Sequence, residues 1–341
     1  MTSFLVGIIV LISACVPDEE EHDMVVIGGG AGALAAAVSA MDAGLDQVVV
    51  LDPGNAADLA ADSVAPAVFA AAGTDLQRGA GIDDTPDEFA EWWMALARGN
   101  ADQDLVDFIA RESAATVSWL ESIGVPFVEP GGAFLPASGP FIAGERAHVV
   151  DGGYAELHGV LYQAAIERGV DIRTHEPVTS LLSDKQGRVV GVRVGLDGRE
   201  HRLLAREAVV LTDGVGAVTD SAIAVDSLLD PTEVQLGGAD RSTDSIALAE
   251  SAGAAVSERT GVTAGYSDGR YRQARIGGLD VTETSHVMRS DGSTIPRLYA
   301  TGRIAGNRYF YRVRLSPQAS TLMLTQARTL GEHVGRYRRG G

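Results

Sequence analysis

A short glycine-rich stretch, Gly28-Gly29-Gly30-Ala31-Gly32-Ala33, has the residue types and spacing that let a protein backbone approach a phosphate group. The first glycine permits a tight turn, Gly30 leaves room for a pyrophosphate, and the small Ala33 lets a following helix pack closely. The N–H groups at the start of that helix would point at the phosphates. The motif predicts binding of an adenine dinucleotide. A glycine turn without a ligand is the structural alternative.

The elements that must position this turn lie on either side of it. Met24–Ile27 is typical of a buried strand, Ala31–Ala43 of an alanine-rich helix ended by Gly44, and Gln47–Leu51 of a second buried strand. Asp52 follows that second strand, where a carboxylate can accept hydrogen bonds from the adenosine ribose. Strand, glycine turn, helix, strand and acidic residue together are far more specific than the glycines alone.

Beyond this unit, helices alternate with short strands. The sequence predicts two amphipathic helices within Pro86–Ile123, a loop over Pro126–Gly144, a helix over Tyr154–Arg168, a strand at Val170–Ile172, two or three strands within Arg188–Leu211, a helix over Ile246–Ala252 and a last helix from Ser316 to about Val334. This order predicts an α/β fold, a Rossmann-like domain with a parallel central sheet and a small antiparallel sheet.

The charge balance argues against a nucleic acid partner, and the single cysteine argues against a structural metal. There are 27 basic and 46 acidic residues, for a formal net charge of −19. A nucleic acid backbone would be repelled by this charge. Cys15 is the only cysteine, and no Cys/His cluster has zinc spacing. We therefore expect no nucleic acid partner and no structural metal.

The N-terminus has the features of an export signal. The apolar run Phe4–Val16 is too short to span a bilayer and has the length of a signal-peptide core. Its residues Ile12-Ser13-Ala14-Cys15 resemble a bacterial lipobox, and residues 16–23 would then be an acidic linker. We expect an extracytoplasmic lipoprotein, anchored to the membrane at Cys15 after removal of the signal in residues 1–15. Met1-Thr2-Ser3 carries no Lys or Arg, so an uncleaved start on a cytoplasmic protein, or a buried N-terminal strand, stays open.

Further motifs, in the same order along the chain, resemble the fumarate reductase and succinate dehydrogenase flavoprotein family, which also includes 3-ketosteroid dehydrogenases and urocanate reductases. The segments that carry the resemblance are Gly73-Thr74, Asp84-Thr85-Pro86, Val117–Phe127, Arg146-Ala147-His148, Asp151-Gly152-Gly153, Val178–Leu181, Leu211–Gly214 and Ile295–Gly302. They cover most of residues 24–335.

The resemblance implies that the cofactor is FAD. No histidine precedes the Ser63 region as covalent flavinylation requires, so the FAD should be non-covalent. The implied cofactor-binding residues are Gly28, Gly29, Gly30, Gly32, Ala33, Asp52, Gly73, Thr74, Val178, Thr212, Asp213, Gly214, Gly302, Arg303, Gln318, Ala319 and Ser320. The start of the last helix would lie near the flavin, where its dipole would stabilise negative charge on the reduced ring.

The chain departs from the family where relatives carry a substrate-covering domain. Only residues 254–276 stand in that place, and they contain neither the family's His-Pro-Thr segment nor its proton-donating arginine. We therefore divide the chain into a first FAD-binding part, 24–253, a residual capping segment, 254–276, and a C-terminal FAD-binding part, 277–341.

Two arginines and two histidines have open roles. Arg303 stands where the family usually places Glu, and it would meet pyrophosphate or turn to solvent. Arg314 matches the spacing of the family's carboxylate-binding Arg and is the candidate catalytic residue, with a surface Arg as the alternative. For His148 and His286 a structural role is expected more than a functional one.

Three functions compete on this evidence. The first is an FAD-dependent oxidoreductase that transfers a hydride between flavin N5 and a small organic substrate, a carboxylate if Arg314 binds it. The second is a non-catalytic or electron-relay flavoprotein that meets a redox partner protein. The third is a lipoprotein that keeps the fold without the cofactor.

Overall fold

A mostly parallel sheet forms the centre of the protein. The computed structural model describes residues 19–55, 57, 67–128, 144–196, 199–212, 222–223, 245–264, 271–310 and 313–340. The strands of the central sheet lie in the order β12 (His286–Met288), β13 (Thr294–Ala300), β8 (Arg199–Leu211), β1 (Glu19–Ile27), β2 (Val48–Asp52) and β5 (Asp171–Thr174). The pairs β13–β8, β8–β1, β1–β2 and β2–β5 are all parallel, which confirms the predicted α/β fold.

Antiparallel strands are attached around this centre. β6 (Val178–Ser183) and β7 (Val189–Leu196) form a hairpin that continues onto β8. A separate sheet has the order β14 (Val313–Leu315), β10 (Val256–Ala264), β11 (Tyr271–Leu279) and β9 (Ala222–Ile223), and a third consists of β3 (Val68–Ala70) and β4 (Ala147–Val149). The segment 254–276 therefore contributes β10 and most of β11.

The predicted helices are all present, the last one continues beyond Val334 to Gly340, and the short helix α3 (Asp75–Gly79) was not predicted. The helices are α1 (Ala31–Asp42), α3, α4 (Pro86–Leu96), α5 (Gln103–Ser122), α6 (Gly153–Glu167), α7 (Ser245–Ser251) and α8 (Ser316–Gly340), with 3-10 turns η1 (Gly144–Arg146) and η3 (Gly302–Ile304). Thr85 starts α4 with a reciprocal capping box to Glu88, and Asp102 caps α5. Most of the predicted loop, residues 129–143, lies outside the described residues.

Both faces of the central sheet are buried, because successive side chains of a strand point to opposite faces. Val25 and Ile27 of β1 join an apolar cluster with α4, α5 and β8. Met24 and Val26 join a second cluster, with α1, α6 and α8. The continuous β-branched runs that mark the strands in the sequence follow from this two-sided burial.

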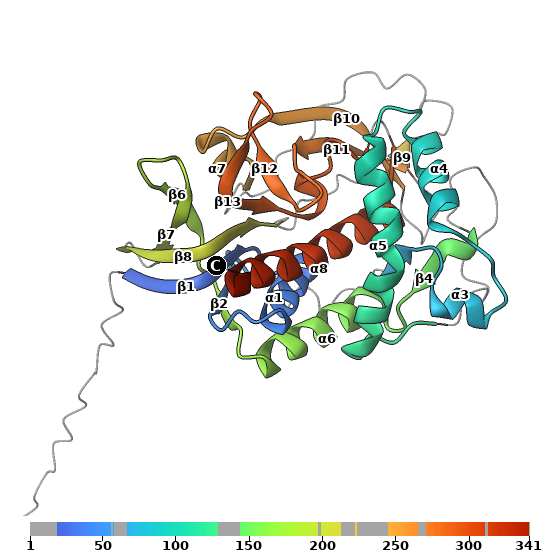
Figure 1. The fold of residues 1–341 in the computed structure, drawn as a ribbon, viewed down its shortest axis with the longest axis horizontal. Helices are drawn as coiled ribbons and strands as arrows, with labels where there is room; N and C mark the ends of the chain where they lie inside the picture. Colours follow the sequence, from blue (N-terminus) through green and yellow to red (C-terminus); the bar gives the residue numbers. More distant parts are fainter. Residues whose placement is uncertain are drawn as a thin grey trace, which may run out of the picture.

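Helix α8 lies between α1 and α5 (Figure 1) and approaches α1 very closely. A Cβ atom on Gly331 would lie 2.7 Å from the Ala40 amide nitrogen and 2.8 Å from the Ala36 carbonyl oxygen. The two helix backbones can meet there only because no side chain separates them. The alanine-rich stretch that predicts α1 is therefore also a packing surface.

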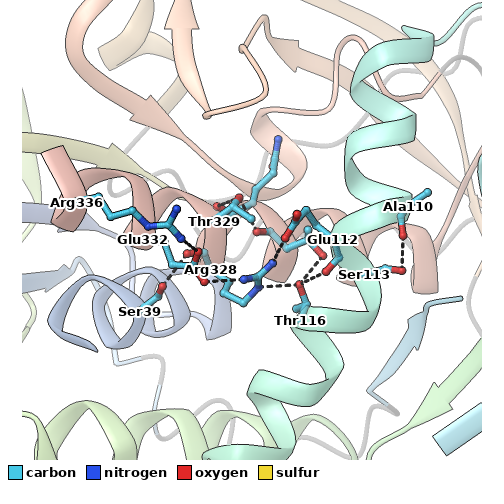
Figure 2. Close-up of polar contacts among 11 residues, drawn as sticks. Ser39, Ala110, Glu112, Ser113, Thr116, Arg328, Thr329, Glu332 and Arg336 are labelled. Carbon is cyan, nitrogen blue, oxygen red and sulfur yellow. Dashed lines mark hydrogen bonds and ion pairs between the residues drawn. The ribbon is translucent and has the colours of Figure 1, made fainter. Parts of the chain in front are cut away.

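Arg328 of α8 is buried and joins three helices (Figure 2). Its Nε donates to the Thr116 hydroxyl of α5 at 3.1 Å, and its two terminal nitrogens pair with Glu332, at 2.6 Å, and with Glu112. Its carbonyl oxygen accepts a hydrogen bond from the Ser39 hydroxyl of α1 at 2.6 Å. A buried charge is tolerated when it is paired in this way.

The first strand begins earlier than the sequence predicts. Residues 19–23, expected as part of the acidic linker, form the first half of β1 and pair with β8. The cause is arginine pairing from distant elements: Arg173 lies 2.6 Å from Glu20, and Arg206 lies 3.1 Å from Glu21 and 3.0 Å from Asp23. Residues 1–18, with the lipobox and Cys15, lie outside the described residues. Within the described part, no helix has the length and apolar character to cross a bilayer.

Two histidines lie close together where the end of α8 packs against β12 and β13. The rings of His286 and His333 are 5.4 Å apart, and His286 also lies 4.2 Å from the ring of Tyr299. Burial, and secondly the charge on His333, lowers the pKa of His286 to about 4. Burial lowers the pKa of His333 as well, with a further contribution from Arg336. Both rings are therefore held neutral in the folded chain.

We expect this pair to make the protein acid-sensitive. An unfolded histidine has a pKa of about 6.5, so the folded state binds fewer protons, and its stability falls as the pH drops from about 6.5 towards 4. Because the His286 ring is only partly buried and solvent screens its charge, we expect a loss of roughly 2 kcal/mol, less than the full pKa change would give. Urea unfolding of wild type and of His286→Gln between these pH values measures it. The wild type should lose stability more steeply, and parallel pH profiles would contradict the prediction.

Candidate cofactor site

The glycine turn lies at the carboxyl end of β1 and leads directly into α1. Gly28 has φ +120°, a backbone conformation that favours glycine, and its N–H donates to the Leu51 carbonyl at 2.8 Å. Gly30 is the N-cap of α1 and provides no side-chain cap, and the first turn of the helix holds no acidic residue. The N-terminus of α1 is thus electrically positive and uncapped by carboxylates, which suits an anion.

The other small residues of the motif permit close packing. A Cβ atom on Gly32 would lie 2.8 Å from Met323 Cγ of α8, and Ala33 is fully buried. The motif therefore holds α1 tightly against both the sheet and α8, which fixes where the helix N-terminus points.

Asp52 lies at the carboxyl end of β2, next to the turn, and is 5 % exposed. One of its carboxylate oxygens accepts a hydrogen bond from the Gly54 N–H at 3.0 Å. Its carbonyl oxygen accepts from the Glu176 N–H at 3.1 Å, which brings the buried Val178, two residues further on, to the same edge of the sheet. Gly30, Asp52 and Val178, three of the predicted cofactor-binding residues, thus lie at the same edge of the central sheet.

Replacing Asp52 by alanine should weaken FAD binding by about 1–3 kcal/mol, since a hydrogen bond to a charged acceptor is lost. The fold should survive, because the Gly54 contact is local. Titration of the flavin-free protein with FAD measures the change. Asp52→Glu serves as the control that keeps a carboxylate, and equal affinity in wild type and Asp52→Ala would rule out the ribose contact.

Thr74 lies in a buried polar network at the end of β3. It caps α3 through a reciprocal box with Gln77, and its hydroxyl lies 2.8 Å from His148 Nε2. His148 Nδ1 lies 2.8 Å from the Arg146 carbonyl, which only accepts, so Nδ1 donates and Thr74 donates to Nε2. Burial lowers the pKa of His148, which keeps this neutral form. His148 thus has the satisfied contacts of a structural histidine, and it orients Thr74.

The ends of β13 and β3 meet the first half of α8. Thr301 donates to the Met323 carbonyl at 2.9 Å, and the Gly302 N–H donates to Gln326 at 3.1 Å. The Thr321 hydroxyl donates to the carbonyl of Ala70 at 2.8 Å. Gly73, Thr74, Gly302 and residues 318–320 are therefore held near one another, with Gln318 buried and Ala319 and Ser320 half-buried.

The remaining predicted residues are only partly described. Thr212 follows β8 and binds the Ile27 carbonyl through both its N–H, at 3.0 Å, and its hydroxyl, at 2.7 Å. Asp213 and Gly214 lie outside the described residues. Arg303 lies in η3 and Arg314 in β14, where its backbone pairs with Thr263, but their side chains are outside the described part.

Two residues of α6 that the motifs did not indicate also contact the glycine turn. His158 Nε2 lies 2.9 Å from the Gly29 carbonyl oxygen, and the Ala31 N–H donates to the Tyr154 hydroxyl at 3.4 Å. Their spacing of four residues on a predicted helix places them on one face. The four-residue spacing can be read from the sequence, but the sequence does not show that this face of α6 packs against the glycine turn.

The described residues fit a dinucleotide better than a metal. The turn, the helix N-terminus and Asp52 lie at the carboxyl edge of the central sheet, and hydrogen bonds join α8 to the end of β13 and to β3. In the described part of the chain, no group of three or more His, Cys, Asp or Glu side chains has a metal-binding arrangement. A cofactor with phosphates at one end and a ring system at the other would contact all of these elements.

Comparison with known proteins agrees with this geometry. Residues 23–263 match the family model described as "FAD binding domain". A cytochrome-linked fumarate reductase of Shewanella frigidimarina is 28% identical over 323 residues, which cover 89% of this chain and 50% of that protein. An L-aspartate oxidase of Caulobacter vibrioides is 30% identical over 198 residues, which cover 57% of this chain and 37% of that protein. The chain thus spans about half the length, or less, of these curated relatives.

Solved structures share the fold. A 3-ketosteroid-Δ4-(5α)-dehydrogenase from Rhodococcus jostii RHA1, in complex with 4-androstene-3,17-dione, superposes with a TM-score of 0.72 at 20% identity, covering 93% of this chain and 97% of that one. The open conformation of a flavocytochrome c3 fumarate reductase gives a TM-score of 0.70 at 18% identity, covering 93% and 78% of the two chains.

Proposed function

We propose a redox function, because this chain belongs to the FAD binding domain family, together with the fumarate reductase and succinate dehydrogenase flavoproteins. The cofactor of this family is FAD. We assign FAD to the carboxyl edge of the central sheet. The observation that carries this assignment is the convergence of the glycine turn, Asp52, Thr74 and the first half of α8 on that edge.

In this assignment the N–H groups of α1 bind the pyrophosphate, and Asp52 accepts hydrogen bonds from the ribose. Gly302, Thr74 and residues 318–320 lie along the flavin. The N-terminus of α8 supplies a positive dipole end there, which favours negative charge on the reduced ring.

The reaction we propose is hydride transfer between flavin N5 and a small organic substrate. The flavin would supply the redox chemistry when bound, and the chain would bind and orient the substrate. Arg314, on β14, is our candidate for holding a carboxylate, because a guanidinium grips a carboxylate with two parallel hydrogen bonds. The hairpin of β10 and β11 stands where relatives carry their larger substrate-covering domain, so we expect a compact substrate.

The rate at which the reduced flavin is reoxidised tests this function. The purified protein, reduced without oxygen, is mixed with fumarate-like acids, and the return of the oxidised flavin spectrum is followed. At least one acid should reoxidise the flavin faster than buffer alone, and Arg314→Gln should slow that acid while leaving reoxidation by a neutral acceptor unchanged. If no acid reoxidises the flavin faster than buffer alone, the reductase assignment fails.

We also propose that the protein is exported and held to the membrane by a lipid on Cys15. The lipobox-like Ile12-Ser13-Ala14-Cys15 and the preceding apolar run support this. Mass spectrometry of the protein from a bacterial host should find an acylated N-terminal Cys15 in the membrane fraction. An intact Met1 in the soluble fraction would contradict the anchor.

A further inference from the structure

One face of α6 carries three ring side chains in a row, Tyr154, His158 and Tyr162. The ring centroids of Tyr154 and His158 are 6.0 Å apart, and those of His158 and Tyr162 are 6.3 Å apart and nearly parallel. Residues four apart in a helix lie on the same face. This row lies against the glycine turn, because its first two members contact the turn directly.

His158 holds the conformation of the turn. Its Nε2 lies 2.9 Å from the Gly29 carbonyl oxygen, and since a carbonyl only accepts, Nε2 is the donor. The side chain is 2 % exposed, so its ring cannot move away without leaving a cavity. The Gly29 carbonyl is therefore pulled towards α6, away from the space in front of α1. An acceptor oxygen turned out of that space no longer repels an anion.

Tyr154 lies at the anion-binding end of α1. Its hydroxyl oxygen accepts the Ala31 N–H at 3.4 Å and would lie 3.6 Å from a Cβ atom on Gly30. A hydroxyl that accepts from this N–H directs its own proton away from the helix backbone. Phosphate oxygens accept hydrogen bonds and do not donate them, so this proton matches the chemistry of the ligand expected there.

We propose that Tyr154 binds the pyrophosphate of FAD directly through its hydroxyl group and that His158 is a positioning residue, which shapes the glycine turn for this contact. The proposal rests on the FAD site assigned above and adds a second wall to it. The glycine motif supplies backbone N–H groups from one side, and α6 supplies a side-chain donor from the other. Tyr154 and His158 act through their side chains, whereas the glycine motif acts through its backbone.

The position of His158 gives the site a pH dependence. Burial lowers the pKa of His158, while its bond to Gly29 and the charge of Asp52 act in the opposite direction. The charged and titratable groups that face the ring are Asp52 from β2 and its neighbours Tyr154 and Tyr162 on α6. A bound pyrophosphate adds negative charge near the ring and raises this pKa. Binding then takes up a proton, so the affinity increases as the pH falls through the pKa that His158 has in the complex.

The test uses ADP and adenosine as probes. Both carry the adenine and ribose that FAD contains, but only ADP carries phosphates. Both are measured by competition with FAD on wild type, Tyr154→Phe and the control Tyr162→Phe, which lies on the same helix face. We expect Tyr154→Phe to weaken ADP and FAD by about tenfold and adenosine not at all. Tyr162→Phe should change none of them. His158→Gln keeps a donor for Gly29 but should abolish the gain in FAD affinity at low pH, which is measured with FAD because its pyrophosphate diester does not titrate in this range.

The outcomes separate the proposal from the site on which it rests. If wild type binds neither FAD nor ADP, the FAD site itself fails. If wild type binds both and Tyr154→Phe binds ADP equally well, the Tyr154 contact is wrong. Should Tyr154→Phe not fold, as judged by circular dichroism, the pH profiles decide. Identical profiles for wild type and His158→Gln would overturn the proposal.

Discussion

Replacing Gly30 by valine should abolish FAD binding and leave the protein folded. Gly30 has φ −78° and ψ 176°, an extended conformation that valine adopts readily. Among the described residues, an added Cβ atom would touch only the Tyr154 hydroxyl, at 3.6 Å, which is an ordinary contact. The valine methyl groups would occupy the space in front of α1, where we place the pyrophosphate. Losing even two charge-assisted hydrogen bonds should lower the affinity by about a hundredfold or more.

The matched control is Gly159→Val, on the exposed face of α6, where an added Cβ atom meets no heavy atom within 4 Å. Flavin titration and urea unfolding of both variants measure affinity and stability separately. Gly159→Val should bind FAD as wild type does. If Gly30→Val also binds FAD normally, the cofactor does not use the N-terminus of α1, and the assigned site is wrong.

Replacing Arg328 by alanine should destabilise the protein by about 3 kcal/mol, the lower end of the range for breaking a buried ion pair. The side chain is 5 % exposed and joins α5 and α8 through Thr116, Glu112 and Glu332 (Figure 2). Its loss would leave the Thr116 hydroxyl facing a cavity and Glu112 without its cation. Because both carboxylates reach water in part, the upper end of the range is not expected.

Arg336 provides the control, since it binds the other oxygen of Glu332 at 2.6 Å but is 74% exposed. Exposed pairs contribute little, so Arg336→Ala should cost less than about 0.5 kcal/mol. Chemical unfolding of the two variants gives the comparison. Similar losses for Arg328→Ala and Arg336→Ala would show that the buried network does not hold the helices together.

The local parts of the site were predictable from the sequence. The glycine turn and Asp52 lie within one strand, helix and strand, so their spacing along the chain fixes their spacing in space. The capping residue Thr85, with Pro86 after it and Glu88 completing the capping box, likewise marks the start of α4. The resemblance to the family implied that the other predicted segments lie near one another, and no local sequence pattern indicated it.

Contacts between distant segments could not be predicted. His158 reaches Gly29 across 129 residues, and Thr321 reaches Ala70 across 251. Such contacts depend on the strand order and on which helix face meets the sheet, and neither is encoded by local spacing. The acidic start of β1 was missed for the same reason. Its carboxylates suggest solvent exposure until Arg173 and Arg206, far along the chain, are placed beside them.

The flavin content of the purified chain, prepared without residues 1–15, shows whether this chain binds FAD. We predict a yellow protein with the visible absorption of flavin and one FAD per chain, or a colourless protein that takes up one FAD when the cofactor is added. Denaturation should release the FAD unmodified, because we expect it to be non-covalent. A folded protein that stays colourless after addition of FAD would show that the assigned site does not bind this cofactor.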